Sequence, residues 1–209
     1  MRKALLIVLA LSASITSEAF GDTRFGFLVG PRYSRVEINR PGVSGDWSAS
    51  FSGFVEWAVN QNVSMVFGVG LARTSYEETF VDLQGPRPDV VATTSIDYAS
   101  FPLLLKFRRG SDAFAPYVEL GPRFDLRLNT EQGLFYFGPG IALLPSYTSE
   151  FIADTILGAS VGVGAEFWRG RILSLLTEVR ANFDFSEISD SPGLEINRSS
   201  IDLLVGLAF

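Results

Sequence analysis

The end of the chain constrains the fold more than any other segment, because it alternates in polarity up to its final residue. In the sequence SIDLLVGLAF, the apolar residues at every second position are Ile201, Leu203, Val205, Leu207 and Phe209. This period of two is that of a β-strand, whose successive side chains point to opposite faces. Terminal residues of soluble proteins are usually poorly ordered in water. The apolar face of a final strand that ends on phenylalanine must therefore be shielded from water, and the rest of the sequence must indicate what shields it.

Seven further segments repeat this alternation, and no helical periodicity of useful length follows residue 22. They are residues 24–34, 47–59, 64–74, 95–108, 117–129, 156–168 and 173–185. The connections alternate in length, since short ones such as NQN and RGR are separated by long ones such as residues 74–94 and 130–150. Short turns on one side and long loops on the other are typical of an up-and-down barrel. We therefore expect an all-β fold, an eight-stranded antiparallel up-and-down β-barrel.

The N-terminus predicts export. Arg2 and Lys3 precede an apolar run from Ala4 to about Ile15, and a small-x-small triplet ending at Ala19 follows. This order is that of a secretory signal peptide, whereas a spanning helix would need about 20 apolar residues. We expect residues 1–19 to be a cleaved signal peptide, with cleavage after Gly21 as the alternative, and residues 23–209 to form the barrel domain.

Composition excludes several kinds of chemistry. The chain contains no histidine and no cysteine. It therefore lacks the usual general base and the commonest metal ligand, and it cannot rely on disulfides in an oxidising compartment. A formal net charge of -6 also makes nucleic acid a poor partner. We expect no catalytic residues, no metal site, no cofactor and no nucleic-acid partner.

Charged residues of the expected strands share one face, and the opposite face is almost free of charge. A soluble barrel would bury its apolar face, but eight strands enclose an interior only just wide enough for side chains. Glycine and serine on the charged face leave room there for arginines to pair with carboxylates. We therefore expect a transmembrane barrel with its apolar face in lipid and a charge network in its lumen. The expected network is Arg24, Arg32, Glu56, Glu119, Arg123, Asp125, Arg127, Glu166, Glu178, Arg180 and Asp202.

Aromatic residues gather near the ends of the expected strands. Such clustering is typical of the two girdles of a membrane barrel, although ordinary core packing is the alternative. The expected girdle residues are Trp47, Trp57, Phe107, Tyr117, Phe167 and Trp168. Tyr33, Tyr98 and Phe185 would join Trp47 near the long loops.

Several of these segments resemble a known family. YASFPLLLKF running into APYVELGPRF, then GASVGVGAEF and the final strand, are similar to the small outer-membrane β-barrel proteins of Bacteroidota, the porin-family or PorT-like barrels. The resemblance implies the cell outer membrane of a Gram-negative bacterium, reached through the periplasm. It also implies that Phe209 is the signal read by the outer-membrane assembly machinery. PorT itself is associated with a secretion system, but no motif here selects that role.

The most favoured function is a non-enzymatic outer-membrane barrel with a structural or surface-interaction role and a polar, plugged interior. A narrow porin for small solutes and an accessory barrel of a secretion system are the alternatives, and an enzyme is disfavoured by the missing histidine. The expected partners are outer-membrane lipid and the assembly machinery. Residues 129–150 are unusually apolar for a loop, so they are a candidate contact for a surface or secretion partner. The alternative is that they extend the flanking strands above the membrane.

Overall fold

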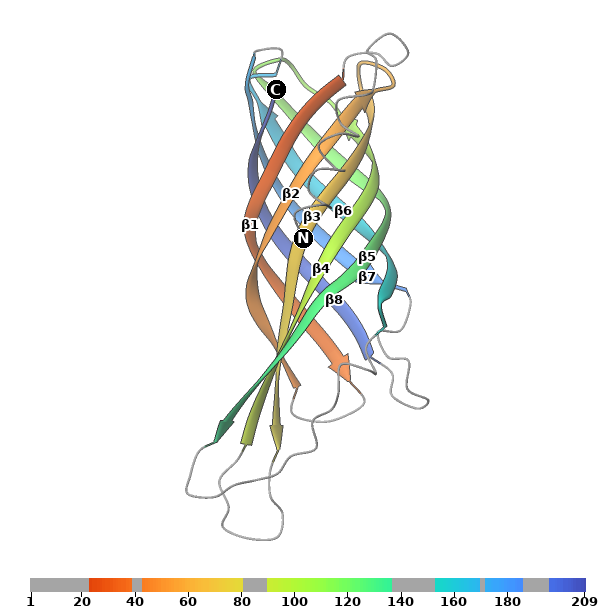
Figure 1. The fold of residues 1–209 in the computed structure, drawn as a ribbon. Coiled ribbons are helices and arrows are strands. Elements are labelled where there is room, and N and C mark those ends of the chain that lie inside the picture. Colours follow the sequence, from red (N-terminus) through yellow and green to blue (C-terminus); the bar gives the residue numbers. More distant parts are fainter. Residues whose placement is uncertain (1–22, 39–42, 81–89, 137–152, 170–171, 186–195) are drawn as a thin grey trace, which may run out of the picture.

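The computed structural model describes residues 23–38, 43–80, 90–136, 153–169, 172–185 and 196–209, and these form one closed barrel of eight strands (Figure 1). Every strand is antiparallel to its neighbours, and the last strand pairs with the first. The strands are β1 (Thr23–Ile38), β2 (Val43–Ala58), β3 (Val63–Phe80), β4 (Val90–Arg108), β5 (Phe114–Tyr136), β6 (Thr155–Phe167), β7 (Ser174–Asp184) and β8 (Ile196–Ala208). The all-β, eight-stranded, antiparallel prediction is confirmed.

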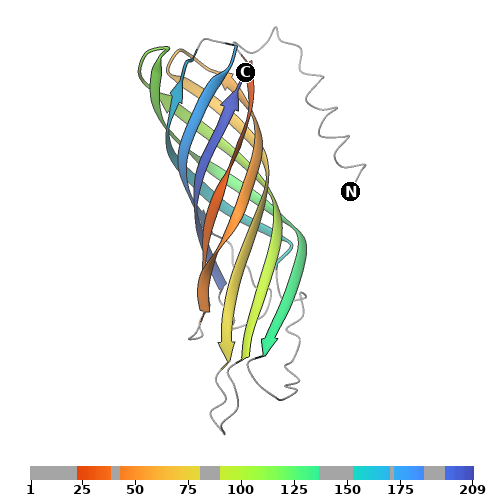
Figure 2. The ribbon, with the colours of Figure 1, turned by 90° about the vertical axis from the view of Figure 1, so that its left-hand side faces the viewer.

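The start of β1 and the end of β8 lie at the same end of the barrel as the short turns (Figures 1 and 2). There, Phe25 and Phe209 exchange two backbone hydrogen bonds of 2.9 and 2.8 Å, so the closing pair extends to the C-terminal residue. We call this the turn end, and the opposite one the loop end. The residues that the structure describes include no helix with the length and apolarity to cross a membrane. The proposed signal peptide, residues 1–19, lies outside the described residues.

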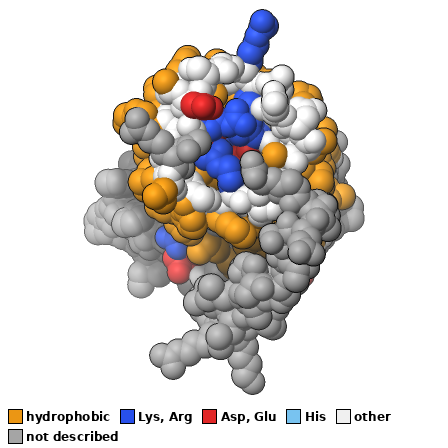
Figure 3. Space-filling model, turned by 90° about the horizontal axis from the view of Figure 1, so that it is seen from above, with side chains coloured by type: hydrophobic (Ala, Val, Ile, Leu, Met, Phe, Trp, Pro, Cys, Tyr) orange, Lys and Arg blue, Asp and Glu red, His pale blue; other side chains and the backbone are white. Residues whose placement is uncertain are grey.

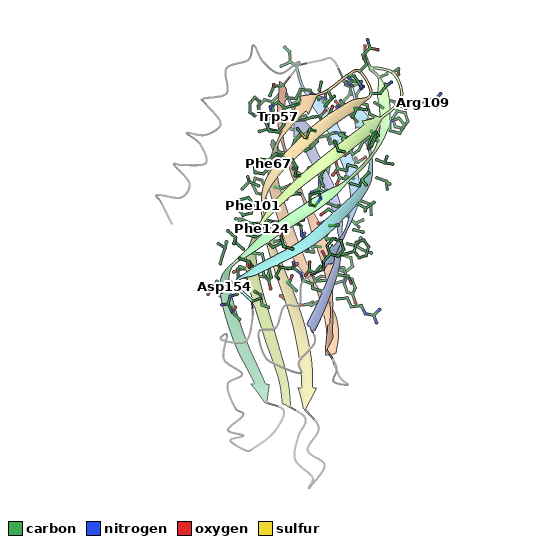
Figure 4. All side chains as sticks on the ribbon, turned by 90° about the vertical axis from the view of Figure 1, so that its right-hand side faces the viewer. Trp57, Phe67, Phe101, Arg109, Phe124 and Asp154 are labelled. Carbon is green, nitrogen blue, oxygen red and sulfur yellow. The ribbon has the colours of Figure 1, made fainter. Side chains whose placement is uncertain are left out.

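Alternation along the strands sorts side chains into two environments. The outer face is apolar: Phe67, Leu105, Phe124 and Val163 are between 37% and 53% exposed. Figure 4 shows Phe67, Phe101 and Phe124 along this outer band. The alternate residues point into the lumen and are buried, as in β7, where buried and outward positions alternate along most of the strand. The reversed polarity, apolar outside and charged inside, is that of a membrane barrel.

The wall is higher on one side than on the other. β3, β4 and β5 have 18, 19 and 23 residues, whereas β6 and β7 have 13 and 11. The β3, β4 and β5 ends project beyond the rest of the barrel (Figures 1 and 2). Much of the expected loops at residues 74–94 and 129–150 is therefore strand, namely residues 74–80, 90–94 and 129–136. Strand extension was the alternative that the sequence left open for residues 129–150, whereas the extensions of β3 and β4 were not expected, because no lipid imposes apolar alternation there.

An exposed ion pair marks where the lipid-facing band ends on this side. Arg73 on β3 and Asp97 on β4 are paired residues, and the Nε–Oδ1 and NH2–Oδ2 distances are 2.7 and 2.9 Å. Their side chains are 45% and 31% exposed. A charged pair on the outer surface is costly in hydrocarbon, so the bilayer core must end before this row. The strand segments beyond it lie in the headgroup region or in water.

Candidate functional site

The lumen contains a balanced set of charges. Seven basic and seven acidic side chains form ion pairs within it, and all of them except Arg24 are less than 10% exposed. The basic residues are Arg24, Arg32, Lys106, Arg108, Arg123, Arg180 and Arg198, and the acidic ones are Glu56, Glu119, Asp125, Glu166, Glu178, Asp184 and Asp202. We call these fourteen residues the lumen network.

Near the turn end, two carboxylates hold three cations. Glu166 on β6 lies 2.6 Å from Arg24 NH1 and 3.6 Å from Arg108 NH1. Glu56 on β2 accepts from Lys106 Nζ at 3.1 Å and also pairs with Arg108. Seen from this end, lysine and arginine side chains fill the mouth of the barrel inside a ring of hydrophobic ones (Figure 3). Arg24 joins β1 to β6, and Arg108 joins β4 to both β2 and β6. The ion pairs of this layer therefore connect strands that share no backbone hydrogen bonds.

Half-way along the lumen, one arginine holds two carboxylates. Arg180 donates to Glu178 from Nε at 2.6 Å and to Glu119 from NH2 at 2.8 Å. Tyr117 donates its hydroxyl hydrogen to Glu178 at 2.9 Å. A Cβ placed on Gly162 would lie only 2.9 Å from atoms of both glutamates, so the bare backbone there makes room for the pair.

At the seam where the barrel closes, Arg32 on β1 faces Asp202 on β8. The two are register partners, and their Nε–Oδ1 and NH2–Oδ2 distances are 2.5 and 2.8 Å. Asn182 on β7 donates to the same carboxylate at 2.9 Å. A bidentate arginine–carboxylate pair fixes orientation as well as charge, so it holds the closing strands in one register.

Toward the loop end, four residues form a square of ion pairs. Arg198 lies 2.7 Å from Asp184 and also pairs with Asp125. Arg123 lies 3.1 Å from Asp125 and also pairs with Asp184. Each carboxylate thus has two cationic partners. The Arg198 guanidinium also lies over the Tyr98 ring, 4.3 Å from its centroid.

The lumen leaves little free volume between these layers. An apolar cluster fills part of the turn-end half, with Leu28, Phe54, Val66, Leu104, Tyr117, Leu176, Leu204 and Ala208. Two internal cavities in the described part of the chain have volumes of about 10 and 20 Å³. A cavity needs about 10–15 Å³ to hold one water, so each admits a single water or so. The described lumen is therefore filled rather than open.

The structure places most of the expected network residues in the lumen. Ten of the eleven expected network residues are in the lumen network, and the other, Arg127, pairs instead with Asp154, whose side chain is 81% exposed at the start of β6 (Figure 4). Four members were missed, namely Lys106, Arg108, Asp184 and Arg198. Lys106 and Arg108 alternate with the outward Leu105 and Phe107, a signal that the leucine run before them obscured.

Two aromatic assignments were wrong. Tyr117 was expected in a girdle, but it is 4% exposed inside the lumen, and Tyr98 is likewise fully buried there. Their neighbours Val118 and Ala99 face outward, so the alternation of the strand points both tyrosines into the lumen. There the Tyr117 hydroxyl donates to Glu178, and the Tyr98 ring lies under the Arg198 guanidinium.

The other expected girdle residues lie at the barrel ends. Trp47 is 60% exposed near the loop end, and its ring centroid is 5.3 Å from that of Tyr33. Phe107, Trp168 and the C-terminal Phe209 are 42%, 51% and 59% exposed at the turn end. Trp57 and Phe167 lie there too, because Trp57 pairs with Thr23 at the start of β1 and Phe167 pairs with Phe114 at the start of β5.

No group of three or more potential ligands among the described residues is placed to hold a metal ion. Residues 129–136, the first part of the candidate partner contact, extend β5. Residues 137–150, which complete it, lie outside the described part of the chain.

Comparisons with known proteins agree with this geometry. A family model described as "Outer membrane protein beta-barrel domain" matches residues 5–209. No curated protein sequence matches the chain. Among solved structures, OprG from Pseudomonas aeruginosa has 11% identity and a TM-score of 0.48 over 89% of this chain and 95% of its own.

Two further solved structures resemble the chain. Neisserial surface protein A has 15% identity and a TM-score of 0.45, covering 88% of this chain and 95% of its own. Ail, the attachment invasion locus protein of Yersinia pestis, has 13% identity and a TM-score of 0.45, covering 90% and 99%. Likeness at this level carries no information about function.

Proposed function

Because the chain belongs to the family of outer membrane protein β-barrel domains, and is therefore an integral protein of the outer membrane, we propose that it is a closed, non-enzymatic barrel that acts as a surface-interaction scaffold. The observation that carries the proposal is the lumen network. Seven cations and seven carboxylates neutralise one another within it, and the cavities beside them hold about one water each. A lumen filled in this way supports a structural role rather than solute passage.

The absence of an enzymatic role is part of the proposal. The buried carboxylates are each engaged by arginine, lysine or tyrosine, so they are poorly placed to exchange protons with a substrate. The chain has no histidine to act as a general base. Exposed charged residues lie outside the lipid-facing band, with Arg109 and Asp112 at the turn end and Glu131 on the projecting end of β5.

The finer family placement is also a proposal. The segments YASFPLLLKF and APYVELGPRF, which form the turn-end halves of β4 and β5, support membership among the PorT-like barrels of Bacteroidota. The same resemblance supports recognition of Phe209 by the assembly machinery, and the order of basic, apolar and small residues at the N-terminus supports removal of residues 1–19 after export.

Conductance in planar bilayers tests the closed lumen. We expect the purified, refolded barrel to insert without steady current, whereas a general porin measured in parallel gives stable steps. Reproducible unitary currents from the refolded protein would overturn the proposal in favour of a narrow porin. Insertion is verified in the same bilayers by protease accessibility of the loop end, so that an absent current is not mistaken for an absent protein.

A further inference from the structure

The free edge of β5 is the feature of the described surface that the closed barrel does not use. β5 pairs with β6 only as far as Leu126 and Thr155, and the last bond on that side runs from the Arg127 N–H to the Asp154 carbonyl at 2.8 Å. From residue 128 to Tyr136, β5 continues to pair with β4 on its other side. Within the described part of the chain, no strand covers this edge.

A bulge sets the direction in which the edge leaves the barrel. Asp97 pairs with Asn129 while the adjacent Tyr98 pairs with Arg127, so Leu128 is an extra residue on β5. Such bulges occur at barrel rims and increase the local twist of the strand. The β5 end accordingly runs away from the barrel beside β3 and β4 (Figures 1 and 2).

The edge lies outside the hydrocarbon core and is accessible. It begins level with the exposed Arg73–Asp97 pair, which marks the end of the lipid-facing band. Asn129 and Glu131 are exposed, and Glu131 reaches Arg73 only at 3.8 Å. An uncovered edge presents alternate backbone N–H and C=O groups that match those of an incoming strand. Nine residues span about 30 Å at a strand rise of about 3.3 Å per residue, which is long enough for a stable added strand.

The charge of the projecting segments indicates the kind of strand that fits. Residues 128–136 carry one charged residue, the exposed Glu131, and no lysine or arginine. A second copy of the chain, paired through the same edge, would bring its own Glu131 to this edge, and like charges repel across paired strands. An extended segment with basic side chains has the opposite, complementary charge.

We propose that the free edge of β5, residues 128–136, binds an extended basic segment of another polypeptide as an added strand. The inference rests on the proposed surface-interaction function and gives it a mode of recognition. Backbone hydrogen bonds along the edge supply affinity, and the exposed Glu131 carboxylate selects for lysine or arginine. Such binding needs no pocket in the barrel and leaves the lumen network unchanged.

Hydrogen exchange on the intact, refolded barrel in lipid tests the proposal. The probe is a nine-residue peptide of alternating lysine and valine, and the matched control is the same peptide with every second backbone nitrogen methylated. We expect the unmodified peptide to slow exchange of those amides of residues 128–136 that face away from β4 by about tenfold or more, as added strand pairing does. The methylated peptide keeps its charge and loses half of its donors, so it should give no protection.

The remaining outcomes are equally decisive. Equal protection by both peptides, or protection confined to other residues, would show that charge alone attracts the probe and would overturn strand addition. If the amides of residues 128–136 that face away from β4 are already protected before peptide is added, the chain covers its own edge, and this result would overturn the proposal as well. The variant Glu131→Lys should weaken binding of the lysine peptide and strengthen binding of the corresponding glutamate–valine peptide.

These results separate this inference from the function on which it rests. Conductance of the refolded barrel would overturn the closed-scaffold function whatever the β5 edge binds. An unprotected edge in a non-conducting barrel would overturn strand addition alone.

Discussion

Removing one partner of the Arg32–Asp202 pair should weaken the barrel far more than removing the corresponding partner of Arg73–Asp97. Both are bidentate arginine–aspartate pairs between register partners on adjacent strands. They differ in environment, since the side chains are 6% and 2% exposed in the first pair and 45% and 31% in the second. The two pairs thus form a matched comparison of burial within one protein.

The expected losses of unfolding free energy follow from the environment of the aspartate that each substitution leaves without its arginine. In Arg32→Met, Asp202 keeps its hydrogen bond from Asn182 but loses its only cation within 4 Å in the described structure. An uncompensated buried charge costs about 3–5 kcal/mol. In Arg73→Met, Asp97 is open to water, so the expected loss is below about 1 kcal/mol. The double variant Arg32→Met/Asp202→Leu removes both buried charges and should recover most of the stability lost by the single change.

The assay is equilibrium unfolding in urea with the refolded barrel in lipid vesicles, followed by tryptophan fluorescence and by the heat-dependent shift of the folded band on gels. Equal losses for Arg32→Met and Arg73→Met would refute the assignment of Arg32 to a buried lumen. A double variant as unstable as the single one would show that the lost stability comes from packing of the arginine stem rather than from the stranded carboxylate.

Three further changes test other parts of the structure. Arg123→Leu should cost about 3 kcal/mol, at the lower end for a broken buried pair, because Arg198 still holds both carboxylates; a loss below about 1 kcal/mol in urea unfolding would contradict the paired arrangement. Tyr117→Phe should cost about 1–3 kcal/mol in the same assay, because Glu178 loses a donor, and an unchanged midpoint would place the hydroxyl elsewhere. Deleting Phe209 removes at most about 2–3 kcal/mol of burial, so refolding in detergent should survive while outer-membrane levels in cells fall. Normal levels in cells would contradict its proposed role as an assembly signal.

Sequence could predict the part of the fold on which lipid acts. Within the bilayer, a period of two with one uncharged face leaves only one arrangement, because a charged side chain on the outside is costly. The alternation along β2 from Trp47 to Trp57 and along β8 to Phe209 reflects the requirement that the lipid-facing side of a strand carries no charge. Strand number, order and the location of the charges followed from it.

Other parts could not be predicted from polarity alone. Beyond the row of Arg73 and Asp97 the outer face of a strand no longer meets hydrocarbon, so β3 and β5 continue there without an apolar period of two. One of the two partners of Arg198 is also not encoded locally, since Asp125 lies 73 residues away on a strand that does not neighbour β8. The inward positions of Tyr98 and Tyr117 follow from the alternation of their strands, so the sequence contained the signal. Tyrosine is typical of membrane girdles, and this residue type led to the wrong assignment.

The lumen network also explains why this barrel has one register. Backbone ladders join neighbouring strands only, and they would form almost as well after a slip of one residue. Such a slip of β7 would carry Glu178 and Arg180 from the lumen into lipid, and it would leave Glu119 without its arginine partner. Arginine on the lipid face costs about 2–4 kcal/mol near the midplane, and the glutamate adds less. Seven of the eight strands, all except β3, contribute charge to the lumen network, so a slip of any of these seven also carries charge toward lipid. Buried charges that add little net stability to the native barrel therefore raise the energy of its misregistered alternatives.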